Sequence, residues 1–332
     1  MLSSRHTVRR GETPANVTAS RVIYLGGLGR SGTTLIERVL GELPGVCSAG
    51  ELIHLWRWGI LDDERCGCGT PFSGCGFWTA VGHRAFGSSG WTRPLGRGML
   101  ELRSRVDRAR YLPQLMAPTD LHPRRRELAA YLRAYRNVYA ALLDESGTSI
   151  VVDSSKHSSL AFCLRHHRDI DLRVVHVVRD SRGVAYSWTK EMARPESAVG
   201  RQLMTRYSPV RSALLWDANN TSLGILGRLG TPRLLMRYED FLVDPRSAVR
   251  RIAGFAELPI APGDLDFLCD AHVELTQAHT VAGNPMRFRT GRIELRRDDA
   301  WQQQLPRRQQ RVISALTAPL LLRYGYPLGV PA

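Results

Sequence analysis

The chain has 332 residues, enough for one large domain or two small ones, and 43% of them are hydrophobic, enough to bury a substantial core. No apolar run approaches the roughly 20 residues of a membrane-spanning helix, and residues 1–20 are polar and basic, without the apolar centre of a secretory signal. We therefore expect a flexible lead-in at 1–20, a single domain over 21–332, and a cytoplasmic protein. The net charge of +15 fits an anionic ligand, but it is weak support for nucleic-acid binding, because nearly all the cations are scattered arginines.

The first predicted elements lie between Arg21 and Leu40. Residues 22–25 form an apolar run typical of a buried strand, a glycine-rich turn follows, and a helical pattern of apolar residues begins at Leu35. A turn that leads from a strand into a helix N-terminus directs unpaired N–H groups and the positive end of the helix dipole at one place. The sequence therefore predicts a phosphate cradle, contributed by Gly29, Arg30, Ser31, Gly32, Thr33 and Thr34.

This turn nearly fits the P-loop pattern over residues 27–34, but Thr33 occupies the lysine position and the cation stands three residues earlier, at Arg30. An ordinary glycine-rich turn would explain the glycines without explaining the arginine and the three hydroxyls. The departure from the pattern argues against a standard nucleoside triphosphate site.

Further along, residues 46–48 are predicted to form a short strand, Gly50-Glu51 lies at its end, and the apolar residues at 52–56 suggest a helix. The stretch 62–98 is rich in Gly, Cys, Ser, Pro and Trp without clear periodicity. We interpret it as a Cys/Gly-rich insertion on the ligand side of the domain. Four tryptophans, Trp56, Trp58, Trp78 and Trp91, suggest that the acceptor is apolar or carries a ring, although they also suit an ordinary core.

Three cysteines stand close together in the insertion, at Cys66, Cys68 and Cys75. A structural zinc site would need a fourth ligand, with His83 or Cys47 as candidates, and the spacing matches no standard zinc finger. Buried thiols or a redox-sensitive pair are therefore favoured, and no metal site is predicted.

Helical patterns at 99–112 and 125–145 precede three more strand-like segments, at 149–153, 172–178 and 234–238, each followed by a helical pattern. Strands that alternate with helices predict an α/β protein with a parallel sheet. Ligands of such sheets bind beyond the carboxyl ends of the strands, where this sequence places polar or charged residues, among them Lys156 and Arg179. Because arginine is used almost everywhere else, Lys156 suggests a site that requires a compact ammonium group.

At this point two segments resemble the sulfotransferases. Tyr-Leu-Gly-Gly-Leu-Gly-Arg-Ser-Gly-Thr-Thr, starting at Tyr24, is similar to their 5′-phosphosulfate loop, and Val-Val-Arg-Asp-Ser-Arg-Gly-Val-Ala-Tyr-Ser-Trp, starting at Val177, is similar to their 3′-phosphate segment. A third segment, Met-Arg-Tyr-Glu-Asp-Phe-Leu-Val-Asp-Pro, matches a later strand and helix of the family. The chain is thus identified as a bacterial-type sulfotransferase, with the resemblance covering roughly residues 21–301.

The resemblance implies a P-loop-like three-layer α/β fold, with a central parallel sheet flanked by helices. It also implies transfer of a sulfuryl group from 3′-phosphoadenosine 5′-phosphosulfate to a hydroxyl or amine, with no metal required. Arg179 and Ser187 would bind the 3′-phosphate, Tyr238 would lie near the nucleotide, and Asn284 and Arg287 would belong to a loop that closes over it. Arg30 and Lys156 would stabilise the leaving phosphate. The Arg-Lys-Gly-x-x-Gly motif of the small-molecule enzymes is absent, and Arg289-Thr-Gly-Arg292 is at best a loose counterpart.

The setting of Glu51, Cys-Ser-Ala-Gly-Glu, is similar to the segment that carries the catalytic glutamate of tyrosylprotein sulfotransferases, so Glu51 is the expected base. A helix-start carboxylate is the ordinary alternative. The histidine base of the small-molecule enzymes is the rival, with His54 as the best candidate and His157 and His279 behind it.

Two other functions remain open from the residues alone. A P-loop kinase or nucleotide hydrolase would use Asp153 or Asp180 to hold Mg²⁺, and a basic protein could bind nucleic acid or glycan without catalysis. We expect a small-molecule, glycan or lipid acceptor and no nucleic acid. The sequence identifies neither the acceptor nor the oligomeric state.

Overall fold

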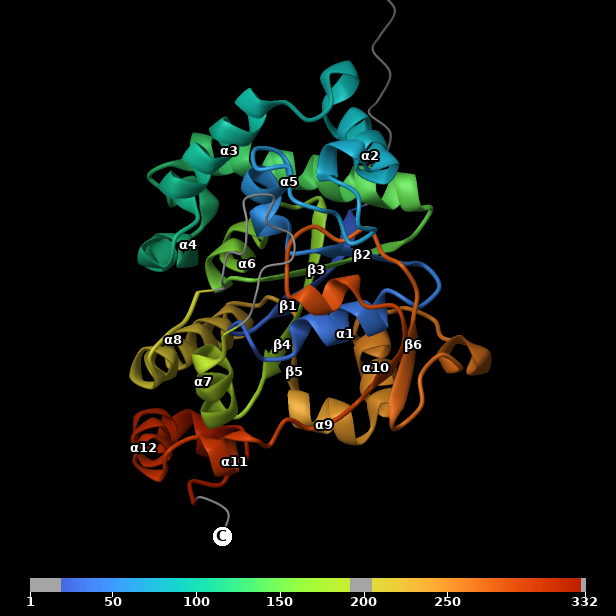
Figure 1. The fold of residues 1–332 in the computed structure, drawn as a ribbon. Coiled ribbons are helices and arrows are strands. Elements are labelled where there is room, and N and C mark those ends of the chain that lie inside the picture. Colours follow the sequence, from blue (N-terminus) through green and yellow to red (C-terminus); the bar gives the residue numbers. More distant parts are fainter. Residues whose placement is uncertain (1–18, 192–204, 330–332) are drawn as a thin grey trace, which may run out of the picture.

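A five-stranded parallel sheet runs through the centre of the molecule, with strand order β2-β3-β1-β4-β5 (Figure 1). This computed structural model describes residues 19–191 and 205–329. The strands of the sheet are β1 (Ser20–Gly26), β2 (Val46–Gly50), β3 (Ile150–Lys156), β4 (Ile170–Val178) and β5 (Arg233–Arg237). The predicted α/β class with a parallel sheet is therefore confirmed, while most of the expected lead-in at 1–20 lies outside the described residues.

Helices cover both faces of the sheet, because successive side chains of its central strand point to opposite sides. Val22 and Tyr24 pack into a core with α5 (Arg125–Ser146) and α6 (Ser158–Leu164), whereas Ile23 and Leu25 pack into a second core on the other face. That second core contains residues of α1 (Thr33–Leu40), α9 (Tyr238–Val243), α10 (Pro245–Phe255) and the antiparallel pair β6 (His272–Leu275) and β7 (Gly291–Glu294). The result is a three-layer arrangement (Figure 1).

The remaining helices extend these layers. They are α2 (Gly76–Phe86), α3 (Arg93–Val106), α4 (Leu112–Met116), α7 (Ser181–Thr189), α8 (Pro209–Arg228), α11 (Trp301–Gln304) and α12 (Arg307–Arg323). Residues Leu52–His54 and Leu55–Gly59 form a 3₁₀ turn and a short π-helical turn where a regular helix was suggested. No helix among the described residues is long and apolar enough to span a membrane.

The stretch 62–98 is more regular than its sequence indicated. It contains α2 and the start of α3, and α2 packs against α5 (Figure 1). Trp91 contacts both Trp56 and Trp78, each at a ring-centroid distance of 6.4 Å, and Trp56 and Trp78 are fully buried. These three tryptophans are core residues, which leaves Trp58 as the member of the set outside that aromatic cluster.

The carboxyl ends of the parallel strands meet at one edge of the sheet. Gly26 of β1 pairs with Lys156 of β3 and with His176 of β4, and Val178 of β4 pairs with Arg237 of β5. This register places the polar segments that follow β1, β3, β4 and β5 beside one another, as the sequence predicts.

Candidate active site

The loop between β1 and α1 has a left-handed backbone at two positions. Arg30 has φ 76° and Gly32 has φ 86°. A Cβ atom at Gly32 would lie 2.1 Å from Cε2 of Tyr238, so the tyrosine ring fills the space where any other residue would carry a side chain. The left-handed conformation of Arg30, which is unfavourable for a non-glycine residue, is the kind of local strain that collects at functional sites.

The hydroxyls of this loop face inward. Ser31, Thr33 and Thr34 are all buried, and among the described residues the Thr33 Oγ1 atom has no hydrogen-bond partner. A buried hydroxyl without a partner is energetically costly. The loop therefore has donor capacity that an anion bound at the start of α1 would use.

Trp188, which sequence reasoning did not single out, packs directly on the loop. Its Nε1 donates to the carbonyl of Gly29 at 3.0 Å, and the Arg30 guanidinium lies over its ring, 5.2 Å from the centroid. A Cβ atom at Gly29 would lie 2.9 Å from the Trp188 ring. A tryptophan inside a helical pattern looks like any core residue, so only the packing of α7 against the loop reveals this contact.

Glu51 and Lys156, at the ends of two neighbouring strands, form an ion pair. Lys156 Nζ donates to Glu51 Oε1 and also to the carbonyl of Ser154, at 3.2 Å. His54 Nε2 lies 3.6 Å from the other carboxylate oxygen, and its ring stacks on Trp58. The Glu51 and Lys156 side chains are only 13% and 12% exposed, so the pair is largely shielded from water.

Arg30 completes this group of charges. Burial lowers the pKa of the Arg30 guanidinium, and the negative charge of Glu51 opposes that shift. The structure thus brings together the three residues for which the sequence predicted a catalytic role: Arg30, Glu51 and Lys156.

Arg179, directly after β4, reaches the same loop. One guanidinium nitrogen donates to the carbonyl of Arg30 at 3.1 Å, and the other donates to the carbonyl of Asp298 at 3.1 Å. The guanidinium also lies over the Tyr238 ring, 5.4 Å from its centroid. Ser187 is half-buried near the end of α7. Its assignment to a 3′-phosphate stays a prediction.

Asp298 is a second residue that the sequence did not indicate. Its carboxylate lies 3.5 Å from Arg179 and 3.3 Å from Lys190 Nζ. Burial acts to raise the pKa of Asp298, but Lys190 and Arg179 outweigh it and hold the pKa below the usual range. Arg179 and Lys190 therefore both contact one acidic group, which lies 119 and 108 residues further along the chain, respectively.

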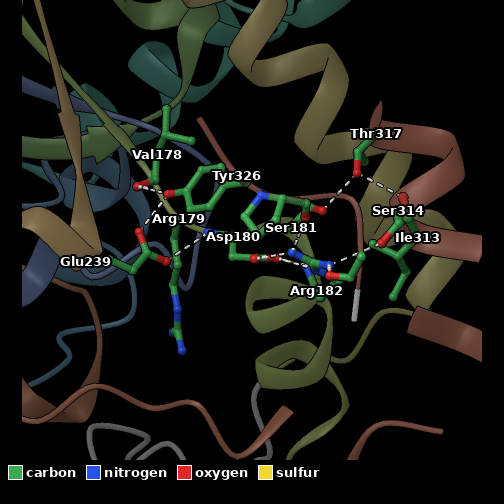
Figure 2. Close-up of polar contacts among 12 residues, drawn as sticks. Val178, Arg179, Asp180, Ser181, Arg182, Glu239, Ile313, Ser314, Thr317 and Tyr326 are labelled. Atoms are coloured by element: carbon green, nitrogen blue, oxygen red, sulfur yellow. Dashed lines mark hydrogen bonds and ion pairs between the residues drawn. The ribbon is translucent and has the colours of Figure 1, made fainter. Parts of the chain in front are cut away.

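A polar network fixes the backbone that carries Arg179 (Figure 2). The Asp180 amide donates to Glu239, and the Tyr326 hydroxyl donates to Glu239 at 2.6 Å and lies 3.3 Å from the carbonyl of Val178. Asp180 accepts two hydrogen bonds from the guanidinium of Arg182, which is 1% exposed. Figure 2 shows the Arg179 side chain pointing away from this network, so the start of α7 is held rigidly while Arg179 extends from it toward the loop.

The chain is similar in sequence to one protein family. The model of the sulfotransferase domain matches residues 22–318. The chain belongs to the sulfotransferase family. No curated protein shows significant sequence similarity to it.

Three solved structures similar to this chain are named as sulfotransferases. The sulfotransferase domain of the Synechococcus PCC 7002 olefin synthase has a TM-score of 0.52 and 20% identity, over 97% of this chain and 100% of that one. The sulfotransferase domain of the curacin biosynthetic pathway has a TM-score of 0.49 and 16% identity, over 94% and 100%. Sulfotransferase STF9 of Mycobacterium avium has a TM-score of 0.46 and 14% identity, over 94% and 78%. The first of these supports the shared fold.

The two aspartates that a magnesium-dependent kinase would use are engaged elsewhere in this sulfotransferase. Asp153 is fully buried and accepts hydrogen bonds from Tyr139 and from the amide and hydroxyl of Ser155, and burial raises its pKa to about 6. Asp180 is paired with Arg182 and also caps α7. Both carboxylates thus have protein partners in this structure.

The segment 279–288 lies beside Glu51 in this sulfotransferase. The Glu51 amide donates to the carbonyl of Val281 at 2.8 Å. Asn284 caps the following turn, and Arg287, 1% exposed, donates to the carbonyls of Thr280 and Arg65 at 2.7 and 2.6 Å. Arg287 thus holds the segment in place here, and a nucleotide contact by Asn284 or Arg287 stays a prediction.

The three histidines considered as alternative bases, His54, His157 and His279, lie in two different surroundings. His54 contacts Glu51, as described, and His157 meets the His54 ring edge-on at a centroid distance of 6.1 Å. His279 lies in the cysteine cluster instead, with Nδ1 3.2 Å from Cys75 Sγ. Of the three, His54 is the one whose ring nitrogen reaches the predicted base.

Proposed function

We propose that this sulfotransferase transfers the sulfuryl group of 3′-phosphoadenosine 5′-phosphosulfate to a hydroxyl or amine of a small-molecule, glycan or lipid acceptor. The observation that carries the proposal is the ion pair of Glu51 with Lys156 at neighbouring strand ends, close enough to Arg30 for the charge of Glu51 to act on its guanidinium. An acid–base group and two cations there match the three needs of the reaction, which are to take a proton, to stabilise a leaving phosphate and to orient the donor.

The loop from Gly29 to Thr34 would bind the 5′-phosphosulfate. Its fit to such a group is supported by the unpartnered Thr33 hydroxyl and by the close approach of Tyr238 and Trp188 to its glycines. The N-terminus of α1 adds N–H groups and a favourable dipole. Arg179 and Ser187 would hold the 3′-phosphate one strand away, with Tyr238 between the two anion sites, where its ring contacts both Gly32 and Arg179.

In the reaction we propose, the acceptor oxygen attacks sulfur in line with the bond to the bridging oxygen. The new S–O bond forms as the old one breaks, and the bridging oxygen leaves with the electron pair on adenosine 3′,5′-bisphosphate. Glu51 takes the acceptor proton. Arg30 and Lys156 stabilise the growing negative charge on the leaving phosphate, and the guanidinium of Arg30 can bind two oxygens at once.

The ion pair of Lys156 with Glu51 gives this scheme an order of events. While the pair is intact, one oxygen of the carboxylate and one hydrogen of the ammonium group are engaged with each other. A donor phosphate would attract the ammonium group, and the carboxylate would then be free to accept a proton. Donor binding would thus prepare the base.

Titration calorimetry with adenosine 3′,5′-bisphosphate in the presence of a chelator tests the proposal. We expect tight binding that does not depend on Mg²⁺, followed by sulfated product when labelled donor is offered with a panel of acceptors. Binding of Mg-ATP together with failure to bind the bisphosphate would overturn the proposal in favour of a kinase or nucleotide hydrolase.

A further inference from the structure

Three cysteines and one histidine bring four metal-ligand atoms together away from the proposed donor site. The ligand atoms of Cys66, Cys68, Cys75 and His279 all lie within 4.8 Å of one another. Nδ1 of His279 is 3.2 Å from Cys75 Sγ and 3.8 Å from Cys66 Sγ, and Sγ of Cys68 is 3.8 Å from that of Cys75. Neither His83 nor Cys47, the two partners considered from the sequence, belongs to this group.

The three separations of 3.2 to 3.8 Å are close to the edges of a tetrahedron around a zinc ion, and the other three are within 4.8 Å. With Zn–S distances of about 2.3 Å and Zn–N distances of about 2.0–2.1 Å, the ligand atoms of a tetrahedral site lie about 3.5–3.8 Å apart. Three sulfurs and one imidazole nitrogen form the Cys₃His ligand set of structural zinc sites. The soft thiolates exclude magnesium or calcium, which prefer oxygen ligands.

The backbone around the cysteines is folded as a tight turn that points the sulfurs inward. The Cys66 amide donates to the carbonyl of Thr70, and the Gly69 amide donates back to the carbonyl of Cys66, each at 2.8 Å. Cys66 and Cys75 are only 1% and 2% exposed. On the histidine side, Phe77 stacks on the His279 ring at a centroid distance of 4.9 Å and fixes its orientation.

We propose that Cys66, Cys68, Cys75 and His279 bind one zinc ion in a closed structural site. With four protein ligands, the ion has no open position for a substrate or a water, so its role is to hold parts of the chain together. The sequence favoured metal-free thiols because the fourth ligand is not near the cysteines in the chain, since His279 follows Cys75 by 204 residues.

The site would join the insertion to the segment that lies against Glu51. The Gly67 amide donates to the carbonyl of Thr280 at 2.9 Å, and Gln277 donates to the carbonyl of Cys68 at 3.1 Å. Two residues beyond His279, Val281 accepts the hydrogen bond from the Glu51 amide. A metal at the cluster would therefore fix the backbone around Glu51 without contacting it.

Metal analysis of the full chain, purified under reducing conditions without chelator, tests this proposal. We expect about one zinc ion per chain, consistent with a single four-ligand site. Cys68→Ser and His279→Gln should lose most of the bound zinc. Cys269→Ser is the matched control, because Cys269 is a free cysteine outside the cluster, and it should keep the wild-type content.

A second measurement on the unmodified chain covers the case in which these variants fail to fold. Exchange of the metal for Co²⁺ should give the visible absorption of a tetrahedral ion together with a thiolate charge-transfer band. The same measurement on a further variant, His279→Cys, should show that the metal is retained and that the charge-transfer band is stronger, because a fourth thiolate replaces the imidazole. The proposal is overturned if reduced protein titrated with zinc or cobalt binds neither, or if Cys68→Ser and His279→Gln fold and keep the same zinc content as Cys269→Ser.

Discussion

Lys156 Nζ donates a hydrogen bond to Glu51 Oε1, so the proposed base and one of the two proposed leaving-group cations are partners in the structure. Glu51→Gln keeps the size of the side chain and removes the carboxylate that would take the proton. We expect donor binding to remain close to wild type and turnover to fall by about 10²- to 10⁴-fold. Calorimetry and a steady-state assay measure the two effects separately.

The matched control for this variant is Glu101→Gln, because Glu101 is exposed and pairs only with Arg105 of its own helix within the described contacts. It should behave as wild type. If Glu51→Gln turned over normally, the base would have to be reassigned, and His54→Gln would be the next variant to assay.

The contact between Gly32 and Tyr238 predicts that Gly32→Ala prevents donor binding. The new Cβ would lie 2.1 Å from the tyrosine ring, at a position whose φ of 86° is itself unfavourable for alanine. The loop or Tyr238 must move, and both belong to the proposed donor site. Calorimetry with adenosine 3′,5′-bisphosphate should show loss of binding.

Gly254→Ala is the control for that experiment, since Gly254 lies within α10 and a Cβ there meets no atom within 4 Å. It should bind the bisphosphate normally and unfold at a slightly higher temperature, because alanine favours the helix by roughly 0.5–1 kcal/mol over glycine. Normal binding by Gly32→Ala would contradict the placement of the 5′-phosphate in this loop.

Arg179→Ala tests the second anion site. A charged hydrogen bond contributes about 1.5–3 kcal/mol, so we expect bisphosphate affinity to fall on the order of 10- to 100-fold. Adenosine 5′-phosphosulfate, which lacks the 3′-phosphate, should lose much less. Calorimetry with both ligands gives the comparison, and Arg168→Ala, at a side chain 95% exposed, is the control. Equal losses for both ligands would show that Arg179 does not recognise the 3′-phosphate.

His176 predicts how the stability of the fold depends on pH. It is fully buried on β4; Nδ1 accepts from Arg233 at 2.9 Å, and Nε2 therefore carries the proton and donates to Asn220 at 2.7 Å. Burial lowers the pKa of His176 to about 4. Because this folded-state value lies below the unfolded value near 6.5, the neutral form stabilises the fold above pH 6.5, and that contribution is lost as the pH falls toward 4.

The difference between the two values corresponds to about 3 kcal/mol of unfolding free energy. Urea unfolding at several pH values between 7 and 4 should show wild type losing about that much more stability than His176→Gln, which has no proton to take up. Parallel losses in the two proteins would assign the acid sensitivity to other groups.

The strands of the sheet could be predicted from the sequence because short apolar runs mark them. The apolar run at 22–25 is short, β-branched in part and followed by two glycines, and its alternate residues do separate onto two faces. The same reasoning placed Glu51, Lys156 and Arg179 at strand ends, and parallel pairing then brings such ends together. It missed α2 and the first turns of α3, because the apolar pattern there is interrupted by glycines, and it suggested that tryptophans now seen in the core could face a ligand.

Trp188, Asp298 and His279 were not assigned their contacts from sequence because each acts across a long separation. Trp188 contacts Gly29 through a hydrogen bond that spans 159 residues, and Asp298 meets Arg179 across 119. Periodicity and local motifs carry no information on such pairings. They are set by how α7 and the segment after β7 pack, which depends on the whole tertiary structure.

The buried guanidinium of Arg182 donates to the carbonyls of Pro327 and Gly329, almost at the end of the described chain. A charge that is 1% exposed requires these partners, and the same arginine fixes Asp180 beside Arg179. During synthesis, the backbone that presents Arg179 thus lacks its last supports until residues near 329 have left the ribosome. We therefore expect the nascent chain to acquire a fully ordered Arg179 segment only after residue 329 has left the ribosome, and a protein shortened before Pro327 to be unable to order that segment fully.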